Sequence, residues 1–205
     1  MKIILIVGPS GAGKDSLLKI CRQAFYDCQD ILFLPRYVTR MPDDNEQNYF
    51  VDQAGFNMLK NNGFFFIDWQ AHGNSYGIIL DPLMKKDRHA VIISVSRTVI
   101  DAFEKVFDDV STIFITAPDD VLRDRLADRN RESGEARDSR LARANLQPEA
   151  RNLFCFENAG MLEETAPKFI ELMANILSLN IPGQAHEESD MPPETKGNAL
   201  DCRET

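Results

Sequence analysis

The chain has 205 residues, of which 43% are hydrophobic and 27% are charged, a balance typical of one globular domain with enough apolar material for a core. Its formal net charge of −9 argues against nucleic acid as the main partner, because a phosphate backbone is bound by a basic surface. The longest apolar stretch near the start, residues 3–7, is far shorter than the ~20 residues of a membrane helix. We therefore expect no membrane partner.

Strands and helices alternate along the chain. Apolar runs predict strands over residues 2–7, 31–34, 90–95, 112–115 and 154–156, with a further extended segment over 63–69. Helical spacing of apolar residues predicts helices over residues 14–25, 56–61, 81–86, 118–129, 139–144 and 162–179. This alternation predicts an α/β fold with three layers, α/β/α, around a parallel core sheet.

The composition changes at Pro182. From there to Thr205 the chain carries six acidic residues against Lys196 and Arg203, with few apolar residues and no periodicity. We interpret residues 182–205 as a disordered acidic tail and residues 1–181 as the folded domain.

The four cysteines stand at positions 21, 28, 155 and 202, and none forms a Cys-x-x-Cys pair. With only three scattered histidines, this pattern argues against a structural zinc site. Only Lys2 precedes the first apolar stretch, which is unlike a signal peptide. We therefore expect a reducing, cytoplasmic location.

Residues 8–14 read Gly-Pro-Ser-Gly-Ala-Gly-Lys and stand between the first expected strand and the first expected helix. They fit the phosphate-loop pattern G-x-x-x-x-G-K in its required context, rather than a glycine-rich turn that only caps a helix. Glycines let backbone N–H groups converge on phosphate oxygens, the helix N-terminus adds partial positive charge, and the lysine reaches the β- and γ-phosphates. The residues expected to bind ATP are Gly8, Pro9, Ser10, Gly11, Ala12, Gly13, Lys14, Asp15 and Ser16.

Asp15 stands where the pattern has Ser or Thr, whose hydroxyl normally binds Mg²⁺. A carboxylate is also a hard oxygen ligand, so Asp15 could hold Mg²⁺ directly or through water. Alternatively, its charge only stabilises the helix N-terminus, by ~0.3–1 kcal/mol. The sequence leaves both interpretations open.

Three further segments resemble the guanylate-kinase branch of the nucleoside monophosphate kinases. They are residues 36–40 (Arg-Tyr-Val-Thr-Arg), residues 69–77 (Trp-Gln-Ala-His-Gly-Asn-Ser-Tyr-Gly), and Arg129-x-Arg131-Glu132 followed by Ser139-Arg140-Leu141. The resemblance implies a P-loop kinase with a small acceptor-binding subdomain over about 36–80 and an arginine-rich lid over about 129–145.

The chain departs from guanylate kinase itself at three places. Asp43 replaces a second acceptor-phosphate arginine, Asn48 replaces a tyrosine, and the strand 92–97 reads Ile-Ile-Ser-Val-Ser-Arg without the usual carboxylates. A closer resemblance is to the ribose 1,5-bisphosphate phosphokinases of phosphonate catabolism, in residues 8–18, 36–40, 69–77, 96–97 and 140–144; Asp15 belongs to this family's pattern. It implies ATP-dependent phosphorylation of ribose 1,5-bisphosphate to phosphoribosyl diphosphate (PRPP), with Mg²⁺ as cofactor.

The resemblance also assigns roles to single residues. Arg40 and Tyr76 would hold the acceptor phosphate, and Arg129 and Arg140 would clamp the ATP phosphates from the lid. Arginine suits these roles because its planar fork binds phosphate bidentately and stays charged. We expect Arg36 or Arg97 to hold the second phosphate of the sugar, although each arginine could instead be a solvated surface residue.

Asp68 stands where guanylate kinases have a glutamate that reads the base. With a sugar acceptor it could accept hydrogen bonds from sugar hydroxyls, or it is a plain loop carboxylate.

Two rival functions remain, a guanylate kinase or other nucleoside monophosphate kinase, and an inactive binding module on the same fold. The sequence does not distinguish a monomer from a homodimer.

Overall fold

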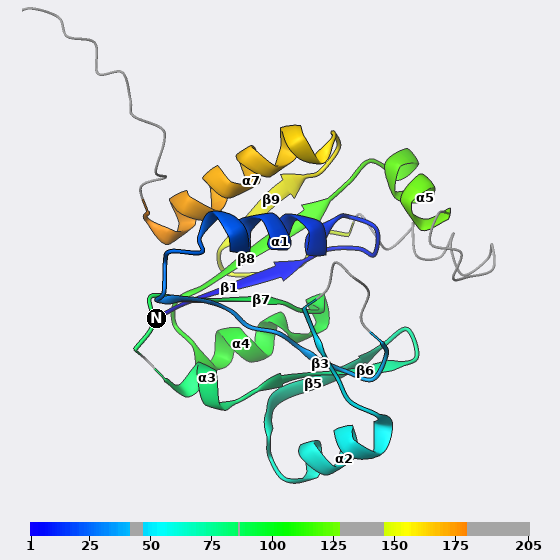
Figure 1. Cartoon of the computed structure of the whole chain (residues 1–205), viewed down its shortest axis with the longest axis vertical. Coiled ribbons are helices and arrows are strands. Elements are labelled where there is room, and N and C mark those ends of the chain that lie inside the picture. Colours follow the sequence, from blue (N-terminus) through cyan, green and yellow to red (C-terminus); the bar gives the residue numbers. More distant parts are fainter. Residues whose placement is uncertain (42–46, 86, 128–145, 180–205) are drawn as a thin grey trace, which may run out of the picture.

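A five-stranded parallel sheet forms the centre of the protein in the computed structural model, which describes residues 1–41, 47–85, 87–127 and 146–179 (Figure 1). The strands are β1 (Lys2–Val7), β2 (Ile31–Phe33), β7 (Ala90–Ser94), β8 (Val110–Thr116) and β9 (Leu153–Glu157). Their order is β2-β7-β1-β8-β9, and all neighbours are parallel. The continuous apolar run of β1 is buried on both faces, as expected for the inner strand of a parallel sheet.

Helices cover both faces of this sheet (Figure 1). One face packs against α1 (Lys14–Ala24) and α7 (Leu162–Leu177), and the other against the short η1 (Arg97–Val99) and α4 (Ile100–Val106). The remaining helix beside the sheet, α5 (Asp119–Ala127), follows β8. The expected three-layer α/β fold is therefore confirmed.

A smaller sheet lies beyond α4, away from α1 and α7 (Figure 1). Its strand order is β4-β3-β6-β5, formed by β3 (Tyr37–Val38), β4 (Tyr49–Phe50), β5 (Phe65–Ala71) and β6 (Asn74–Ile79), with α2 (Gln53–Asn61) and α3 (Asp81–Met84) beside it. Phe66 joins it to the central domain, because its ring lies 4.9 Å from that of Phe103 on α4.

Several elements differ from the sequence-based expectation. The extended segment expected over 63–69 is the first strand of a hairpin, and its partner β6 was missed. The turn between them has positive φ at His72 (54°) and Gly73 (73°), the conformation of the tight turn that favours hairpins. The helix expected from residue 56 begins at Gln53, since the Asp52 carboxylate accepts a capping hydrogen bond from Gly55 N at 2.7 Å.

Some expectations fall on residues that the structure does not describe. The helix expected over 139–144, the end of that expected over 118–129, the lid over 129–145 and the tail over 182–205 lie outside the described residues. Among the helices of the described ranges, none is both long and apolar enough to cross a membrane.

Candidate active site

The expected phosphate loop lies between the end of β1 and the start of α1 at Lys14. Two of its glycines are required by space as well as by conformation. Gly8 has φ of +151°, and a Cβ there would lie 2.1 Å from the carbonyl oxygen of Ile115 on β8. Gly13 has φ of +83°, and its Cβ would lie 2.3 Å from Nδ2 of Asn158. The loop can therefore lie this close to the sheet only without side chains at these positions.

The Lys14 side chain curls back over the loop. Its Nζ donates hydrogen bonds to the carbonyl oxygens of Gly8 at 2.8 Å and Pro9 at 2.7 Å. The ammonium is thus held beside the loop's backbone, where a loop of this type binds the β- and γ-phosphates of a nucleotide.

Two residues that the sequence analysis missed support the loop from behind. Asn158, which is 2% exposed, donates from Nδ2 to the carbonyl oxygen of Ala12 at 2.8 Å. Arg125 on α5 donates from Nη1 to the carbonyl oxygen of Gly11 at 3.4 Å. Asn158 could have been found because it directly follows β9, whose carboxyl end lies at the same sheet edge as that of β1. Arg125 could have been found because it stands four residues before Arg129 in the sequence.

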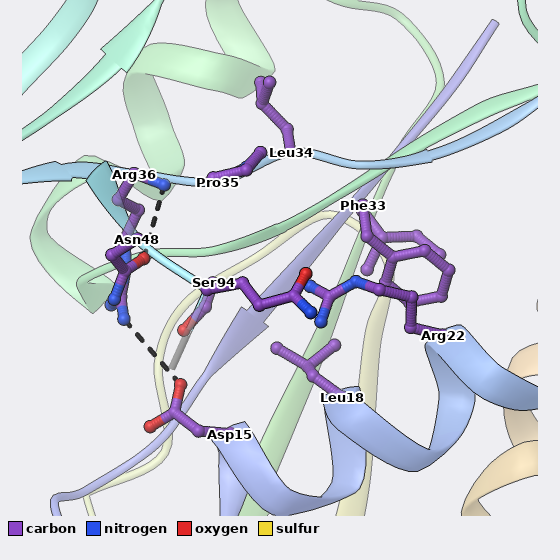
Figure 2. A pocket seen from close by; sticks show the side chains of 11 residues that line it. Asp15, Leu18, Arg22, Phe33, Leu34, Pro35, Arg36, Asn48 and Ser94 are labelled. Carbon is purple, nitrogen blue, oxygen red and sulfur yellow. Dashed lines mark hydrogen bonds and ion pairs between the residues drawn. The ribbon is translucent and has the colours of Figure 1, made fainter. Parts of the chain in front are cut away.

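Asp15 and Arg36 connect the two regions of the molecule (Figure 2). Asp15 stands on the first turn of α1, and its Oδ1 lies 3.7 Å from Nη2 of Arg36, which directly precedes β3. Asn48 holds the arginine in place, because its Oδ1 accepts from Nε of Arg36 at 3.2 Å and from its backbone N at 3.3 Å. The guanidinium is thus fixed between the phosphate-loop helix and the smaller sheet.

Tyr76 also contacts this guanidinium. The Cζ of Arg36 is 5.7 Å from the centre of the Tyr76 ring, within the range of a cation–π contact. The Tyr76 ring is stacked on Trp69, with 5.5 Å between ring centres and 8° between planes. Arg40 stands two residues after Val38, which pairs with Tyr76 across the smaller sheet. The Nη1 of Arg40 donates a hydrogen bond to the carbonyl oxygen of Met41 at 3.4 Å.

These polar groups border a small hollow of about 30 Å³ at the carboxyl ends of β2 and β7 (Figure 2). Its polar lining consists of Asp15, Arg22, Arg36, Gln47, Asn48 and Ser94. This volume holds a water molecule or an ion but is smaller than a sugar phosphate. The hollow by itself therefore cannot hold the whole of a sugar phosphate.

Two residues expected to bind the acceptor do not line this hollow. Asp68 on β5 accepts at Oδ1 from Nζ of Lys60 at 2.6 Å, an ion pair with α2. Arg97 lies over the ring of Phe114 at 5.8 Å and donates from Nη1 to the carbonyl oxygen of Leu146. Burial lowers the pKa of the Arg97 guanidinium below its ordinary value.

The structure thus brings Arg36 into contact with both Asp15 and Tyr76, while Arg97 does not line the hollow. Ser16 is half-buried in the first turn of α1. Arg129 and Arg140 lie outside the described residues.

Comparisons with known proteins agree with this arrangement. A family model described as guanylate kinase matches residues 1–168. A ribose 1,5-bisphosphate phosphokinase from Bradyrhizobium diazoefficiens is 36% identical, with 85% of this chain and 88% of that protein covered. Another from Desulfomicrobium baculatum is 32% identical, with 89% and 98% covered. In fold, the chain is similar to a crystal structure of guanylate kinase from Anaplasma phagocytophilum, with a TM-score of 0.59, 22% identity and 85% of each chain covered.

Proposed function

Because the chain belongs to the guanylate kinase family and, within it, to the ribose 1,5-bisphosphate phosphokinases, we propose that it transfers the γ-phosphoryl group of ATP to the 1-phosphate of ribose 1,5-bisphosphate. The products are 5-phosphoribosyl 1-diphosphate and ADP. The observation that carries this proposal is the Arg36 guanidinium, which Asn48 and Tyr76 hold beside Asp15 at the start of α1. A guanidinium at this place suits an anionic sugar phosphate rather than a nucleobase.

The chemistry explains why the site is built from cations and backbone groups. The accepting phosphate oxygen is already ionised at neutral pH, so the reaction needs no general base. The barrier arises from the repulsion of two anions that must meet in line, away from water. In the proposed mechanism the phosphate loop and Lys14 bind the ATP phosphates, and Arg129 and Arg140 clamp them from the lid, as the family resemblance implies. Arg40 and Tyr76 hold the accepting phosphate.

We assign the second phosphate of the sugar to Arg36 rather than Arg97. Arg36 contacts both Asp15 and Tyr76, and its Nε and backbone N are both held by Asn48. Arg97 packs on Phe114 and donates to a backbone carbonyl. Of these two arginines, therefore, Arg36 is the one whose guanidinium lines the hollow between α1 and the smaller sheet.

The residues present also fit Mg²⁺. The Asp15 carboxylate stands at the loop position that normally carries the metal-binding hydroxyl, and a carboxylate is a hard oxygen donor of the kind that Mg²⁺ prefers. We therefore propose Asp15 as the protein's carboxylate toward Mg²⁺. When bound with ATP, Mg²⁺ neutralises charge on the phosphates and keeps several of its waters.

We also propose that the reaction takes place in the cytoplasm, which fractionation of cells expressing the tagged protein tests.

A product assay tests the proposed function. The purified protein is incubated with ATP, Mg²⁺ and either ribose 1,5-bisphosphate or GMP, and products are identified by ³¹P NMR and mass spectrometry. We expect a diphosphate at the sugar's 1-position and ADP only with the bisphosphate, and no product with Lys14→Met. Conversion of GMP to GDP instead would make the protein a guanylate kinase, and nucleotide binding with no transfer to any acceptor would make it a binding module.

A further inference from the structure

The hollow beside Asp15 carries more positive than negative charge. Among the described residues that line it, Arg22 and Arg36 are the cations and Asp15 is the only carboxylate. That carboxylate already pairs with Arg36, because its Oδ1 lies 3.7 Å from Nη2 of the arginine. A second guanidinium is therefore left without a counter-charge in the hollow, and guanidiniums are well suited to bind phosphate. The lining favours an anionic ligand over a cation.

Arg22 provides this second guanidinium. It stands in the last turn of α1 and makes no hydrogen bond or ion pair within the described part of the chain; its Cζ lies 5.3 Å from the centre of the Phe33 ring. The side chain is half-buried, and burial lowers the pKa of its guanidinium below the ordinary value. Figure 2 shows Arg22 and Arg36 extending into the hollow from opposite sides. An anion held by both would supply the missing counter-charge.

Ser94 adds a buried hydroxyl without a partner. It is the last residue of β7 and is 7% exposed, and its Oγ makes no hydrogen bond within the described part of the chain. Buried polar groups of native proteins are nearly always hydrogen-bonded, and an exception calls for a missing ion, water or ligand. Ser94 lines the same hollow as the two arginines, and a hydroxyl can donate its proton to a phosphate oxygen.

We propose that this hollow receives the phosphate on carbon 5 of the sugar, and that Arg22 and Ser94 complete the subsite to which Arg36 belongs. This inference rests on the proposed function. A phosphate monoester carries a charge of about −2 near neutral pH, and Arg36 alone, already paired with Asp15, leaves most of that charge unbalanced. The hollow's volume of about 30 Å³ suits a small anionic group and excludes the sugar ring, so only the end of the substrate enters.

The position of Asp15 leaves room for such a ligand. Arg22 stands seven residues after Asp15 on the same face of α1, which places it ~10 Å further along the helix axis. The phosphate can therefore bind at the Arg22 end of the hollow, away from the carboxylate. The ion pair with Arg36 also offsets the charge of Asp15.

Arg22 has one alternative role, which is structural. A cation in the last turn of a helix stabilises the helix dipole, and the contact with Phe33 packs α1 against β2. An arginine with this role alone would affect all ligands of the site to the same extent. A residue that binds the 5-phosphate affects only ligands that carry this group.

Two sugars that differ only in the 5-phosphate test the inference. The dissociation constants of ribose 1,5-bisphosphate and ribose 1-phosphate are measured by isothermal titration calorimetry with ADP present, which has no γ-phosphoryl group to transfer. We expect wild type to bind the bisphosphate at least ~100-fold more tightly, as for two charged hydrogen bonds. Arg22→Met, which keeps an apolar stem beside Phe33, should weaken bisphosphate binding by ~10–100-fold and ribose 1-phosphate binding by less than ~3-fold.

A second variant and a control accompany this measurement. Ser94→Ala should weaken binding of the bisphosphate alone, by ~2–10-fold, the range for one hydrogen bond. The matched control is Lys19→Met, which removes a cation from an exposed position of the same helix. Both of its dissociation constants should equal those of wild type.

Three results overturn the inference. They are equal weakening of both sugars by Arg22→Met, unchanged bisphosphate binding in that variant, and a wild type that binds the two sugars equally. The proposed function is judged separately, with ATP in place of ADP. If Arg22 sets the preference for the bisphosphate but no phosphoribosyl diphosphate is formed, the subsite stands and the assigned reaction is wrong. If the product is formed and the preference does not depend on Arg22, the reaction stands and the subsite is wrong.

Discussion

The central parallel sheet and the smaller sheet contribute to the site by different means. The central sheet provides a phosphate loop made of backbone, set against β8 and Asn158 so closely that Gly8 and Gly13 have no room for a Cβ. The smaller sheet provides side chains in pairs, such as Arg36 with Asn48 and Trp69 with Tyr76. Substitutions in the first region should therefore change the fold and phosphoryl transfer, and those in the second should change affinity for the acceptor.

The largest effect is expected at Lys14, whose ammonium group we propose to contact the ATP phosphates. Lys14→Met removes the ammonium that Gly8 and Pro9 carbonyls hold at the loop. We expect kcat to fall by ~10²–10³, the usual loss for one group that stabilises transition-state charge. Lys19→Met, on the exposed part of the same helix, is the control and should keep full activity. An equal loss in both would assign the effect to α1 rather than to phosphate contact.

The next largest effect is expected on stability. Gly8→Ala should lower the free energy of unfolding by about 3 kcal/mol, since a positive φ is strained for alanine and the Cβ would meet backbone 2.1 Å away. Gly73→Ala is the matched control, because Gly73 also has positive φ (+73°) but nothing within 4 Å of its Cβ; about 1 kcal/mol is expected there. Calorimetry should show the Gly8 variant melting ~6–12 °C lower. Equal losses of stability in the two variants would mean that the positive φ alone, and not the close approach of the Ile115 carbonyl oxygen, requires glycine at position 8.

The central sheet could be predicted from the sequence because its signals are local. A buried strand such as β1 is a continuous apolar run, and the phosphate loop is a fixed pattern between strand and helix. In the smaller sheet, β5 was expected as the extended segment 63–69, whereas β3 and β4 were missed because they have two residues each. Such short segments carry no periodicity, and their pairing with β6 is a tertiary property.

The residues of the candidate site also differ in whether a local sequence pattern predicts them. Lys14 and Asp15 could be placed on the helix start from the pattern alone. The choice between Arg36 and Arg97 could not, because both are arginines near motif residues, and only the fold shows that one faces Asp15 and the other packs on Phe114.

The third effect separates these two arginines. Arg36→Ala should raise the KM for ribose 1,5-bisphosphate by ~10–100-fold, the range for a lost charged hydrogen bond, while the KM for ATP stays within ~3-fold. Arg97→Ala should change neither by more than ~3-fold, because that side chain binds a backbone carbonyl and an aromatic ring. Steady-state kinetics with each substrate varied gives all four values. The reverse pattern would move the second sugar phosphate to Arg97.

The smallest effect is expected at Asp68, at the edge of the smaller sheet. If its carboxylate accepts from a sugar hydroxyl, Asp68→Asn should raise the KM for ribose 1,5-bisphosphate by ~2–10-fold, as for one hydrogen bond. Lys60→Met removes the partner seen in the structure, at 2.6 Å from Asp68, without removing the carboxylate. Because the Lys60 side chain is 52% exposed, this loss should change the free energy of unfolding by less than ~1 kcal/mol and leave the KM unchanged. If Asp68→Asn leaves the KM unchanged, Asp68 only forms the ion pair with Lys60. Recognition of the acceptor is then confined to the part of the smaller sheet beside Arg36.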